Sequence, residues 1–437
     1  MTAATSLQAW LARLERQHPV AIDLGLERVA EVARRLALLD TPLATRVITV
    51  AGTNGKGSTV AMLEAVAREH GLRTAAYTSP HLLRYNERLR LAGCEADDAA
   101  LVEGFEAVEA ARLDGDPVTL TYFEAGTLAA LWLIARWQPD VALLEVGLGG
   151  RLDAVNVIDP DVAVVTTVAQ DHAAFLGTHL DTIGREKAGI LRAGRPAVLG
   201  STTLPASVRE RADALSAPVF ALQEAFAWRM DDRGQEGSEW QWQGTAPGGE
   251  KVALHGLPDP GLPLDNAAVA LQTLALADVT LDETATRRAL SRVVLAGRLQ
   301  WLGPWCLDVG HNPHAAAYVA GQLAQRPRRG RRLCLLGMLA DKDADGVIAA
   351  LAPQIDAWVT VSLSGDRARD AAQLATFVEG RGAKVLHQGA SPEDGVRWLH
   401  ANMDNGDDIL VCGSFWTVAE ALAALETLGA ASSRSAS

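Results

Sequence analysis

Residues 47–58 read VITVAGTNGKGS, and the rest of the chain is interpreted outward from this stretch. The β-branched, apolar run Val47–Val50 is typical of a strand that is buried on both faces. Three glycines and a lysine follow, and Ser58 opens a helical pattern that Gly71 ends. A strand, a glycine-rich turn and a helix start in this order predict a phosphate-binding loop.

The turn carries the groups that a bound phosphate needs. Glycines let backbone N–H groups approach phosphate oxygens, the start of the helix favours their negative charge, and the Ser58 hydroxyl can bind the accompanying Mg²⁺. The general P-loop pattern is matched only in part, because Val50 replaces the usual first glycine and Gly57 separates Lys56 from Ser58. The alternative is a structural glycine turn with an exposed lysine. The flanking strand and helix favour phosphate binding.

The overall composition narrows the class of protein. A chain of 437 residues with 49% hydrophobic and 21% charged residues is typical of a globular protein with two or three domains. The net charge of −13 argues against nucleic acid or an anionic membrane as the main partner, although one basic loop can still bind a small anion. The N-terminal stretch has no signal-peptide core, and no apolar run approaches the ~18 residues of a membrane span. We expect a cytoplasmic protein.

The cysteines bear on the redox compartment. Cys94, Cys306, Cys334 and Cys412 show no C-x-x-C spacing and lie mostly in apolar runs. The sequence therefore predicts buried thiols in a reducing compartment.

Further strands of the first domain end at polar residues. The apolar runs predict strands over residues 74–77, 141–146 and 162–168, and helices within 1–46 and over 120–137, 264–276 and 282–294. The polar residues at these strand ends are Ser79, Glu145 and the pair Asp171-His172. Open α/β sheets bind ligands beyond the carboxyl ends of their strands, so we expect these side chains in one crevice with the phosphate loop.

The pattern changes after about residue 220. Short alternating segments around Trp228, Trp240 and Trp242 are separated by polar, glycine-containing stretches. They predict a small antiparallel meander near residues 220–255, at the edge of the main sheet.

From about Gly297 the alternation of strands and helices begins again. Strands are expected near residues 305–309, 333–337, 358–363, 384–387 and 409–412. This pattern predicts a second, smaller doubly wound α/β domain. We place the two domains at residues 1–295 and 296–430, and a disordered tail at 431–437.

Ser58, Glu145 and His172 are candidates for binding Mg²⁺. An Mg²⁺ ion that bridges nucleotide phosphates needs a few hard oxygen ligands, usually one or two carboxylates and a hydroxyl. His172 is the weaker candidate, because imidazole is a less usual ligand for this ion. A strand-end carboxylate that hydrogen-bonds a loop is the alternative for Glu145, and the neighbouring phosphate loop favours the metal role.

Lys187 lies in GREKAGILR, residues 184–192, between Glu186 and apolar residues. If the side chain points inward, burial lowers its pKa, and the partly neutral amine can act as a nucleophile or add CO₂ to form a carbamate. A carbamate would turn a cation into an oxygen ligand beside the metal. Composition alone favours a salt bridge on a helix surface instead.

The segment LDVGHNPH, residues 307–314, ends a strand of the second domain. Asp308 can accept hydrogen bonds from ribose hydroxyls, and His311 can face an adenine or a phosphate, with Arg298 nearby in the chain. A lone histidine is more often structural, but Asp, His and Asn crowded at one strand end favour a ligand site. Lys342 in GMLADKD is a similar, weaker candidate.

Ten segments match one known pattern, in order, from about residue 20 to residue 425. They are DLGLERV, VAGTNGKGS, TSPHLLRYNERL, TYFEAGTLAALW, LLEVGLGGRLDAVNVID, QDHAAFLG, IGREKAGILR, DVGHNPHAA, GMLADKD and CGSFWTVAEAL. GTNGKGS alone indicates a Mur-type ligase, and the SPH, EVGLGGRLDA and REKAG segments are more specific. The chain resembles the folylpolyglutamate synthase/dihydrofolate synthase family of the Mur ligase superfamily.

The resemblance implies an ATP-dependent amide ligase, with a P-loop domain followed by a smaller Rossmann-like domain that binds glutamate. The γ-phosphate of ATP would pass to a carboxylate of dihydropteroate or of a folate, and the amine of L-glutamate would then attack the acyl phosphate. A carboxylate is a poor electrophile until one oxygen becomes part of a leaving group, and phosphoryl transfer depends on positioning and charge neutralisation. One monomeric chain is expected to carry out both dihydrofolate synthesis and polyglutamylation.

The resemblance also implies roles for single residues. The nucleotide would contact Gly52, Asn54, Gly55, Lys56, Gly57, Ser58, Asn266, Arg298, Asp308 and His311. Ser58 and Glu145 would bind one Mg²⁺, and Ser79 and His172 a second. Lys187 would be carbamylated to N6-carboxylysine, and the catalytic residues would be Lys56, Lys187 and His172. Since nucleotide contacts come from both domains, domain closure is expected to assemble the site.

The folate substrate would lie against three segments of the first domain. Its expected contacts are Leu26, Arg28, Val29, Thr121, Phe123, Arg151, Asp153 and Ala154. They belong to the stretches that would line the pterin and aminobenzoate pocket in the family.

The sequence departs from the family pattern at three positions. Asp265 precedes Asn266 where the family often has a proline or another uncharged residue, which could shift that loop. Gly310 stands where alanine is usual, and Gln170 precedes Asp171-His172 where an apolar residue is common. None of the three removes an expected ligand.

Other functions stay open at this point. A monofunctional folylpolyglutamate synthase is the nearest alternative. A UDP-muramoyl amino-acid ligase shares GTNGKGS, but such enzymes usually carry a further N-terminal domain, and only 46 residues precede the first strand. A nucleotide-binding ATPase without ligase activity would leave Lys187 and the second domain without a role.

Overall fold

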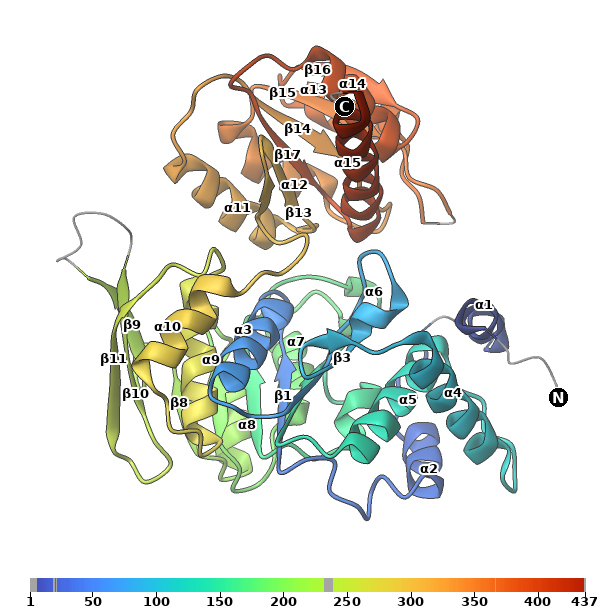
Figure 1. Ribbon diagram of the computed structural model, residues 1–437, viewed down its shortest axis with the longest axis vertical. Coiled ribbons are helices and arrows are strands. Elements are labelled where there is room, and N and C mark those ends of the chain that lie inside the picture. The colour runs from blue at the N-terminus through green and yellow to red at the C-terminus, as the bar shows by residue number, and fades with distance from the viewer. Residues whose placement is uncertain (1–5, 19, 21, 232–238, 366, 436–437) are drawn as a thin grey trace. The chain divides into compact units, whose positions relative to one another are not determined.

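The computed structural model describes residues 6–18, 20, 22–231, 239–365 and 367–435, with the backbone alone for 430–435. The chain divides into two compact units, Met1–Val293 and Val294–Ser437. Each unit is built on its own β-sheet (Figure 1). The α/β fold class predicted from the sequence is confirmed in both.

The main sheet of the first unit has eight strands in the order β4-β3-β2-β5-β1-β6-β7-β8. Its strands are β1 Arg46–Ala51, β2 Thr74–Tyr77, β3 Leu89–Leu91, β4 Cys94–Glu95, β5 Val141–Glu145, β6 Val162–Val165, β7 Ala197–Leu199 and β8 Val219–Ala221. From β2 to β8 neighbouring strands are parallel, and the β3–β4 hairpin is antiparallel. β5, β1 and β6 are therefore neighbours at the centre, with their carboxyl ends at one edge.

Helices cover both faces of this sheet, which explains why its central strands are mostly apolar and almost wholly buried (Figure 1). They are α1 Leu7–Gln17, α2 Glu27–Arg35, α3 Lys56–Glu69, α4 Asp98–Leu113, α5 Tyr122–Trp137, α6 Ala173–Leu176, α7 Leu180–Lys187, α8 Ala206–Ala214, α9 Leu264–Leu276 and α10 Glu283–Arg292. Short 3₁₀ turns lie at η1 Tyr85–Arg88, η2 Ala154–Val157 and η3 Ala188–Ile190. α1, α2, α4 and α5 share a core with Val47, Tyr77 and Leu144 of the sheet. α3 and α9 pack on each other and contact β5 and β6 respectively.

A separate antiparallel sheet follows the edge strand β8. Its strands are β9 Ala227–Met230, β10 Trp240–Thr245 and β11 Lys251–Leu257, in the order β11-β10-β9. Trp240 and Trp242 of β10 are fully buried, and β10 packs on α9. We refer to these three strands as the meander.

The second unit has a six-stranded sheet in the order β12-β13-β17-β14-β15-β16, parallel except for β12. Its strands are β12 Gln300–Leu302, β13 Trp305–Asp308, β14 Arg332–Leu336, β15 Ala357–Val361, β16 Val385–Gly389 and β17 Asp408–Cys412. Its helices are α11 Pro313–Gln325, α12 Ala344–Leu351, α13 Ala371–Gly380, α14 Pro392–Asn402 and α15 Phe415–Ser435, with the 3₁₀ turn η4 Ala352–Gln354. This is a doubly wound arrangement of the kind that the sequence predicts.

The structure differs from the sequence predictions at Cys94 and in the C-terminal tail. Cys94 is exposed, whereas Cys306, Cys334 and Cys412 are buried. The prediction of a buried thiol is wrong for Cys94 because it lies on the two-residue edge strand β4. α15 extends through residues 431–435 of the expected disordered tail, and residues 436–437 lie outside the described residues.

Within the described part of the chain, no helix combines the length and the apolar character needed to cross a membrane.

Candidate active site

The loop between β1 and α3 depends on glycine at two positions. A Cβ atom on Gly52 would overlap the Thr166 hydroxyl oxygen. Gly55 has a φ of +88°, and a Cβ there would lie 2.9 Å from the side-chain oxygen of Asn266. A side chain at either position would therefore disturb the loop.

Hydrogen bonds tie this loop to the end of β6. The Thr53 backbone N–H donates to the Thr167 carbonyl at 2.8 Å, and the Asn54 N–H donates to the Thr167 hydroxyl at 3.0 Å. The Thr166 hydroxyl donates to the Asn54 carbonyl at 2.7 Å. Thr166 and Thr167 are not among the residues predicted from the sequence, although two threonines at the end of a buried strand were a usable signal.

Lys56 is the first residue of α3 and folds back over the loop. Its Nζ donates to the carbonyl oxygens of Gly52 at 3.0 Å and of Thr53 at 3.3 Å. The ammonium group thus lies beside the start of a helix, where backbone N–H groups also favour an anion.

Ser58 is the third residue of α3 and is buried. Its hydroxyl donates to the Gly55 carbonyl at 3.1 Å and accepts from Asn266 Nδ2 at 2.8 Å. Asn266 belongs to the first turn of α9 and is itself buried. These two bonds fix the direction of the hydroxyl and leave one of its lone pairs for a further contact.

Glu145 and Ser79 meet beside the phosphate loop. Glu145 ends β5, is paired in register with Val50 of β1, and is buried. Its Oε2 accepts from the backbone N–H of Ser79 at 3.3 Å. The sequence prediction that these strand ends converge is met for this pair.

His172 approaches from the other side of β1, because it follows β6. It has a φ of +51° and precedes the four-residue helix α6. Its backbone N–H donates to Asp171 Oδ1 at 2.8 Å, and its Nε2 lies 4.0 Å from Asp171 Oδ2. The ring is partly exposed, and the Asp171 carboxylate is largely buried.

The donor atoms present suit a hard cation that also binds phosphate. Among the residues that the structure describes, no three His, Cys, Asp or Glu side chains cluster tightly enough to hold a metal ion by themselves. The Ser58 hydroxyl and the buried Glu145 carboxylate are oxygen donors, the type that Mg²⁺ prefers when phosphates complete its coordination. The residues therefore fit a nucleotide-bound Mg²⁺ better than a free-standing metal centre.

Lys187 ends α7 and is only 3% exposed. Its pKa is lowered to about 7, mainly by burial and also by the nearby charge of Lys56, while Asp171 and Asp153 oppose the shift. The alternative of a surface salt bridge is therefore wrong for this lysine. The charge of the phosphate-loop residue Lys56 therefore acts directly on the Lys187 side chain.

The turn after β5 packs against the end of α7. A Cβ on Gly150 would lie 2.9 Å from the Glu186 carbonyl oxygen and 3.0 Å from that of Lys187. The Arg151 backbone N–H donates to the Glu186 carbonyl at 2.8 Å, and the Arg151 Nε donates to Glu186 Oε1 at 2.9 Å. Gly150 and Arg151 of the GLGGR segment thus support the backbone of Glu186 and Lys187.

Asp153 is a second buried ionisable group of this region. Its carboxylate accepts backbone N–H bonds from Leu148 at 2.7 Å and from Val155 at 3.0 Å. Burial raises its pKa to about 6, against the opposing effect of these hydrogen bonds and of the Lys56 charge. Asp153 orders the turn that leads from Glu145 to η2.

Three of the expected folate-binding residues are linked by polar and aromatic contacts. Arg28 forms ion pairs with Asp23 at 2.7 Å and with the buried Glu124 at 2.8 Å. Glu124 accepts from the backbone N–H of Thr121 at 2.7 Å, and Thr121 is the N-cap residue of α5. Phe123 lies against Gly147, where an added Cβ would come within 2.5 Å of its ring.

Two other expected folate contacts lie in the core. Val29 is fully buried and Ala154 is 2% exposed, both within the core that α2 and α5 share. Their side chains therefore cannot contact a ligand without rearrangement, because close-packed neighbours surround them. Leu26 precedes α2 and is partly exposed.

In the second unit, Arg298 and His311 lie beside Phe415, and the charges of both act on Asp308. Asp308 ends β13, is buried, and accepts N–H bonds from Leu299 at 3.0 Å and from Gly310 at 2.7 Å. The guanidinium of Arg298 lies 5.7 Å from the centre of the Phe415 ring, and the His311 ring centre lies 6.4 Å from it. Burial raises the pKa of Asp308, and the Arg298 charge opposes this.

Comparison with known proteins places both units in one superfamily. Residues 50–199 match the Mur ligase middle domain, and residues 297–415 match the Mur ligase glutamate ligase domain. The Escherichia coli (strain K12) dihydrofolate synthase/folylpolyglutamate synthase is 42% identical over 431 residues, which cover 97% of this chain and 96% of that protein. The chain belongs to the dihydrofolate synthase/folylpolyglutamate synthase family of Mur ligases, which add glutamate with ATP.

Solved structures of the family have the same fold. Escherichia coli FolC in complex with DHPP and ADP has a TM-score of 0.89 at 40% identity and covers 97% of this chain and 98% of its own. The Yersinia pestis family enzyme complexed with AMPPNP and Mn ion has a TM-score of 0.86 at 43% identity and covers 98% of this chain and 100% of its own. The predicted family, fold class and ligase activity are thus confirmed. The UDP-muramoyl ligase and non-ligase ATPase alternatives are left without support.

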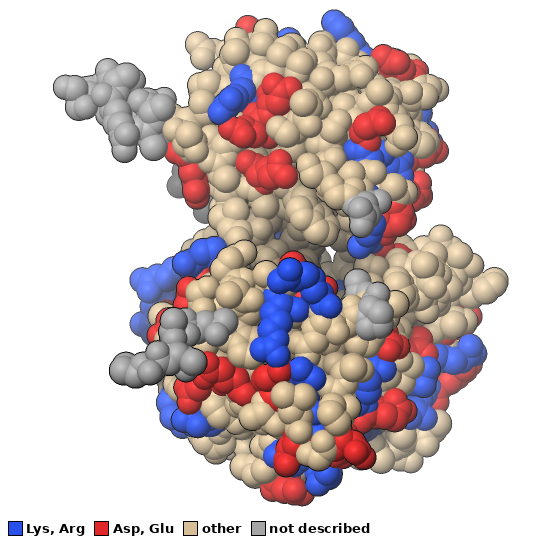
Figure 2. Space-filling model, turned by 90° about the vertical axis from the view of Figure 1, so that its right-hand side faces the viewer, with Lys and Arg blue, Asp and Glu red and all other residues tan. Residues whose placement is uncertain are grey.

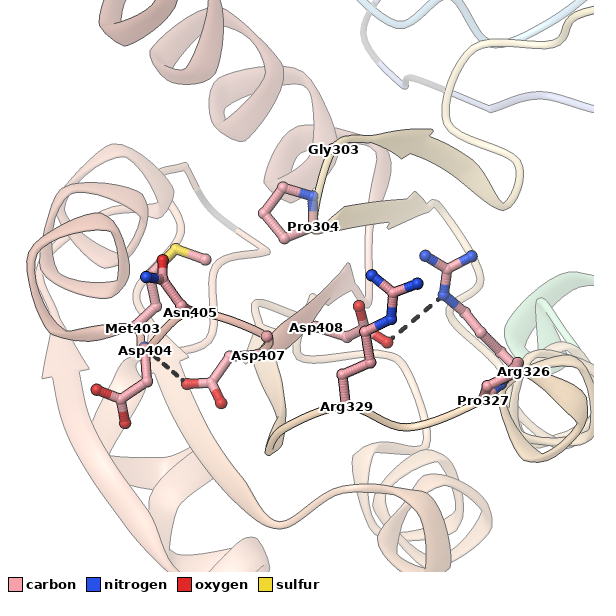
Figure 3. Close-up of a pocket in the computed structure, with 11 residues that line it drawn as sticks. Gly303, Pro304, Arg326, Pro327, Arg329, Met403, Asp404, Asn405, Asp407 and Asp408 are labelled. Atoms are coloured by element: carbon pink, nitrogen blue, oxygen red, sulfur yellow. Dashed lines mark hydrogen bonds and ion pairs between the residues drawn. The ribbon is translucent and has the colours of Figure 1, made fainter.

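The second unit of this chain has a cavity of about 450 Å³, and none of the residues predicted to bind a ligand lines it (Figure 3). It is lined in part by Arg326, Arg329, Asp404 and Asp408. Asp408 begins β17, so the cavity lies at the amino ends of the strands. Asp308 lies at the opposite, carboxyl edge, where α/β sheets bind ligands.

Proposed function

We propose that this ligase joins L-glutamate to dihydropteroate, which gives dihydrofolate, and to tetrahydrofolates, which gives polyglutamates. The observation that carries the proposal is the phosphate loop, in which Lys56 and Ser58 lie at the start of α3 next to the buried Glu145. Family membership supports the same activity.

The reaction has two transfer steps. An oxygen of the acceptor carboxylate attacks the γ-phosphorus of ATP, the bond to the β-phosphate oxygen breaks, and ADP leaves. The neutral amine of glutamate then attacks the carbonyl carbon of the acyl phosphate, phosphate leaves with the bonding electrons, and the nitrogen loses a proton. Both steps depend on positioning and on compensation of the phosphate charge.

The first unit would hold the triphosphate. Lys56 would neutralise phosphate charge, and the residues whose backbone would cradle the phosphates are Gly52, Asn54, Gly55, Gly57 and Ser58. Asn266 would support the loop through its bond to Ser58.

Two Mg²⁺ ions belong to the proposal. Ser58 and Glu145 would hold one, and Ser79 and His172 the other, with phosphate oxygens as further ligands. Bound Mg²⁺ supplies charge compensation on the phosphates. The AMPPNP and Mn ion in the Yersinia pestis relative are consistent with this part of the proposal.

Lys187 would serve as a carbamate. A lysine with a pKa of about 7 is substantially neutral at physiological pH, and a neutral amine adds CO₂ with loss of one proton. The product, N6-carboxylysine, would present oxygen atoms near Lys56 in place of a second cation. The electrostatic effect of Lys56 on Lys187 supports this role, because the charge of Lys56 disfavours a second cation on the buried Lys187.

The remaining assignments complete the proposal. Leu26, Arg28, Thr121, Phe123, Arg151 and Asp153 would shape the folate site, whereas Val29 and Ala154 would act only through packing. Arg298, Asp308 and His311 of the second unit would contact the nucleotide, and the domain closure that this requires stays a prediction. So do the monomeric state and the cytoplasmic location.

The charge pattern agrees with small-molecule substrates. On the face shown in Figure 2, Lys and Arg side chains are interspersed with Asp and Glu. No continuous basic surface of the kind that binds nucleic acid covers that view, and the net charge is −13.

The decisive experiment measures ADP release by the purified chain with ATP, Mg²⁺, L-glutamate and dihydropteroate. We expect release that requires both glutamate and the acceptor, and that Lys56→Ala lowers at least 100-fold, a loss on the order of that caused by removing one electrostatic contact to a transition state. Lys251→Ala, at an exposed lysine of β11, is the matched control and should retain full activity. ADP release that ignores either co-substrate contradicts the proposal.

The monofunctional alternative is tested in the same assay. Replacing dihydropteroate with tetrahydrofolate separates the two activities. Turnover with both acceptors supports the bifunctional enzyme, and turnover with tetrahydrofolate alone supports a folylpolyglutamate synthase.

A further inference from the structure

The meander has no role in the proposed chemistry, yet it is joined to the phosphate loop through one helix. α9 packs on α3, which begins in the phosphate loop, and on β10 of the meander. Most of α9 is buried, including Asn266 near its start and Gln272 two turns later. Two sets of hydrogen bonds, one at the start of α9 and one at Gln272, connect this helix to the meander.

The first contact lies at the start of α9. The indole Nε1–H of Trp228 in β9 donates to Asp265 Oδ1 at 2.7 Å. The next residue, Asn266, donates through Nδ2 to the Ser58 hydroxyl at 2.8 Å. One short path therefore runs from the meander to the hydroxyl that faces the expected phosphates.

The second contact lies two turns further along α9. The side-chain amide of the fully buried Gln272 accepts from the Thr245 N–H at 3.0 Å and donates to the Thr245 carbonyl at 2.7 Å. A Cβ on Gly244 would lie 2.5 Å from Gln272 Oε1, so glycine is needed beside this clamp. The Trp228–Asp265 bond thus adds a second polar contact between the meander and α9, at the first turn of the helix.

We propose that Trp228 and Asp265 are positioning residues that fix the first turn of α9, so that Asn266 keeps the Ser58 hydroxyl directed for ATP binding. This inference rests on the proposed function.

Asp265 has one competing explanation. A carboxylate in the first turn of a helix is favourable by itself, because it faces the positive end of the helix dipole. That effect needs no Trp228. The two explanations therefore differ in what happens when only the indole N–H is removed.

The test compares Trp228→Phe, Asp265→Ala and Asp265→Asn in the full-length enzyme. Trp228→Phe and Asp265→Ala should each raise the KM for ATP about three- to tenfold, because one hydrogen bond is lost from the path. Asp265→Asn keeps an acceptor oxygen and should restore most of the affinity. The KM for glutamate and the melting temperature should stay near their wild-type values.

A double variant tests the coupling. Trp228→Phe with Asp265→Ala should raise the KM for ATP no more than either single change, because both remove the same bond. The matched control is Glu239→Ala, which removes the acceptor of the 3.0 Å bond from Arg287 and so loosens the meander from α10 without touching α9. This control should leave the KM for ATP unchanged.

Three results would overturn the inference. They are an unchanged KM for ATP in Trp228→Phe, an equal rise in the KM for ATP in Glu239→Ala, or a parallel rise in the KM for glutamate. Each of these requires an active wild-type enzyme. A wild-type chain that releases no ADP would instead refute the proposed function, so the two failures are distinguishable.

Discussion

Lys187 has a buried position that a charged lysine tolerates poorly, since burial alone disfavours its ammonium form. We expect Lys187→Ala to lower kcat about 10- to 100-fold, as loss of a residue that supports bound metal commonly does. A small carboxylate such as acetate should restore part of the activity by occupying the space of the carbamate. Kinetic assays with and without acetate check this, and full activity of the alanine variant would end the carbamate assignment.

The same lysine makes stability depend on pH. Its pKa is about 7 in the folded protein and 10.5 when unperturbed. Between these values the unfolded chain binds a proton that the folded chain does not, so the free energy of unfolding rises as pH increases from 7 towards 10. Below pH 7 both states are protonated and this dependence vanishes.

Lys187→Met should remove that contribution. Denaturant unfolding in CO₂-free buffer at several pH values between 6 and 10 should show a rise in the wild type that is smaller in the variant. Other titrating groups are common to both proteins and cancel in the difference. Parallel pH profiles would show that Lys187 is not a buried amine of low pKa.

A comparison of Gly55 with Gly115 distinguishes backbone strain from steric overlap with a neighbouring side chain. Gly55→Ala places a side chain at a φ of +88° and brings its Cβ 2.9 Å from Asn266, so we expect a loss of about 1–2 kcal/mol and a raised KM for ATP. Gly115 has a φ of +77° and open space around it. Gly115→Ala should therefore cost similar stability without changing the KM for ATP, as measured by thermal unfolding and initial rates.

At the scale of elements, the start of α5 joins helix capping to the expected folate site. Thr121 and Glu124 form a capping box, and Glu124 also binds Arg28. Thr121→Ala removes the hydroxyl that accepts from the Glu124 backbone N–H at 3.2 Å, so it should cost about 1 kcal/mol. It should also raise the KM for dihydropteroate, because the first turn of α5, which carries Glu124, is then held less firmly.

The N-cap of α4 provides the comparison. Asp97 caps α4 through the Ala100 N–H at 2.8 Å. Asp97→Ala should cost a similar free energy of unfolding and leave the KM for dihydropteroate unchanged. An equal rise in that KM for both variants would mean that general destabilisation, and not the position of Arg28, controls the folate site.

At the scale of the whole molecule, two units with separate cores should unfold in separable steps. We expect two transitions in calorimetry. An ATP analogue with Mg²⁺ at 100 times its Kd should raise the transition of the first unit by about 5 °C, since ligand binding at that excess adds about 2.7 kcal/mol. Lys56→Ala should abolish the shift, and a shift that survives this change would place the phosphates elsewhere.

Local sequence was enough for the framework of both units. The phosphate loop, the strands that end at Glu145 and Asp308, and α9 follow from apolar periodicity and from glycine positions, which act between neighbouring residues. Short strands such as β4, β7, β8 and β12 were not predicted, because two- or three-residue segments carry little periodicity and depend on their partners.

The sequence by itself determined which groups are available: a lysine and a serine at a helix start, an acid at a strand end, and the family these belong to. Only the tertiary structure decided that Lys187 is buried near Lys56, that Val29 and Ala154 lie in the core, and that Trp228 reaches Asp265. Backbone conformation is set largely by neighbours along the chain. Burial, pKa and hydrogen-bond partners are set by residues that packing brings together from distant positions.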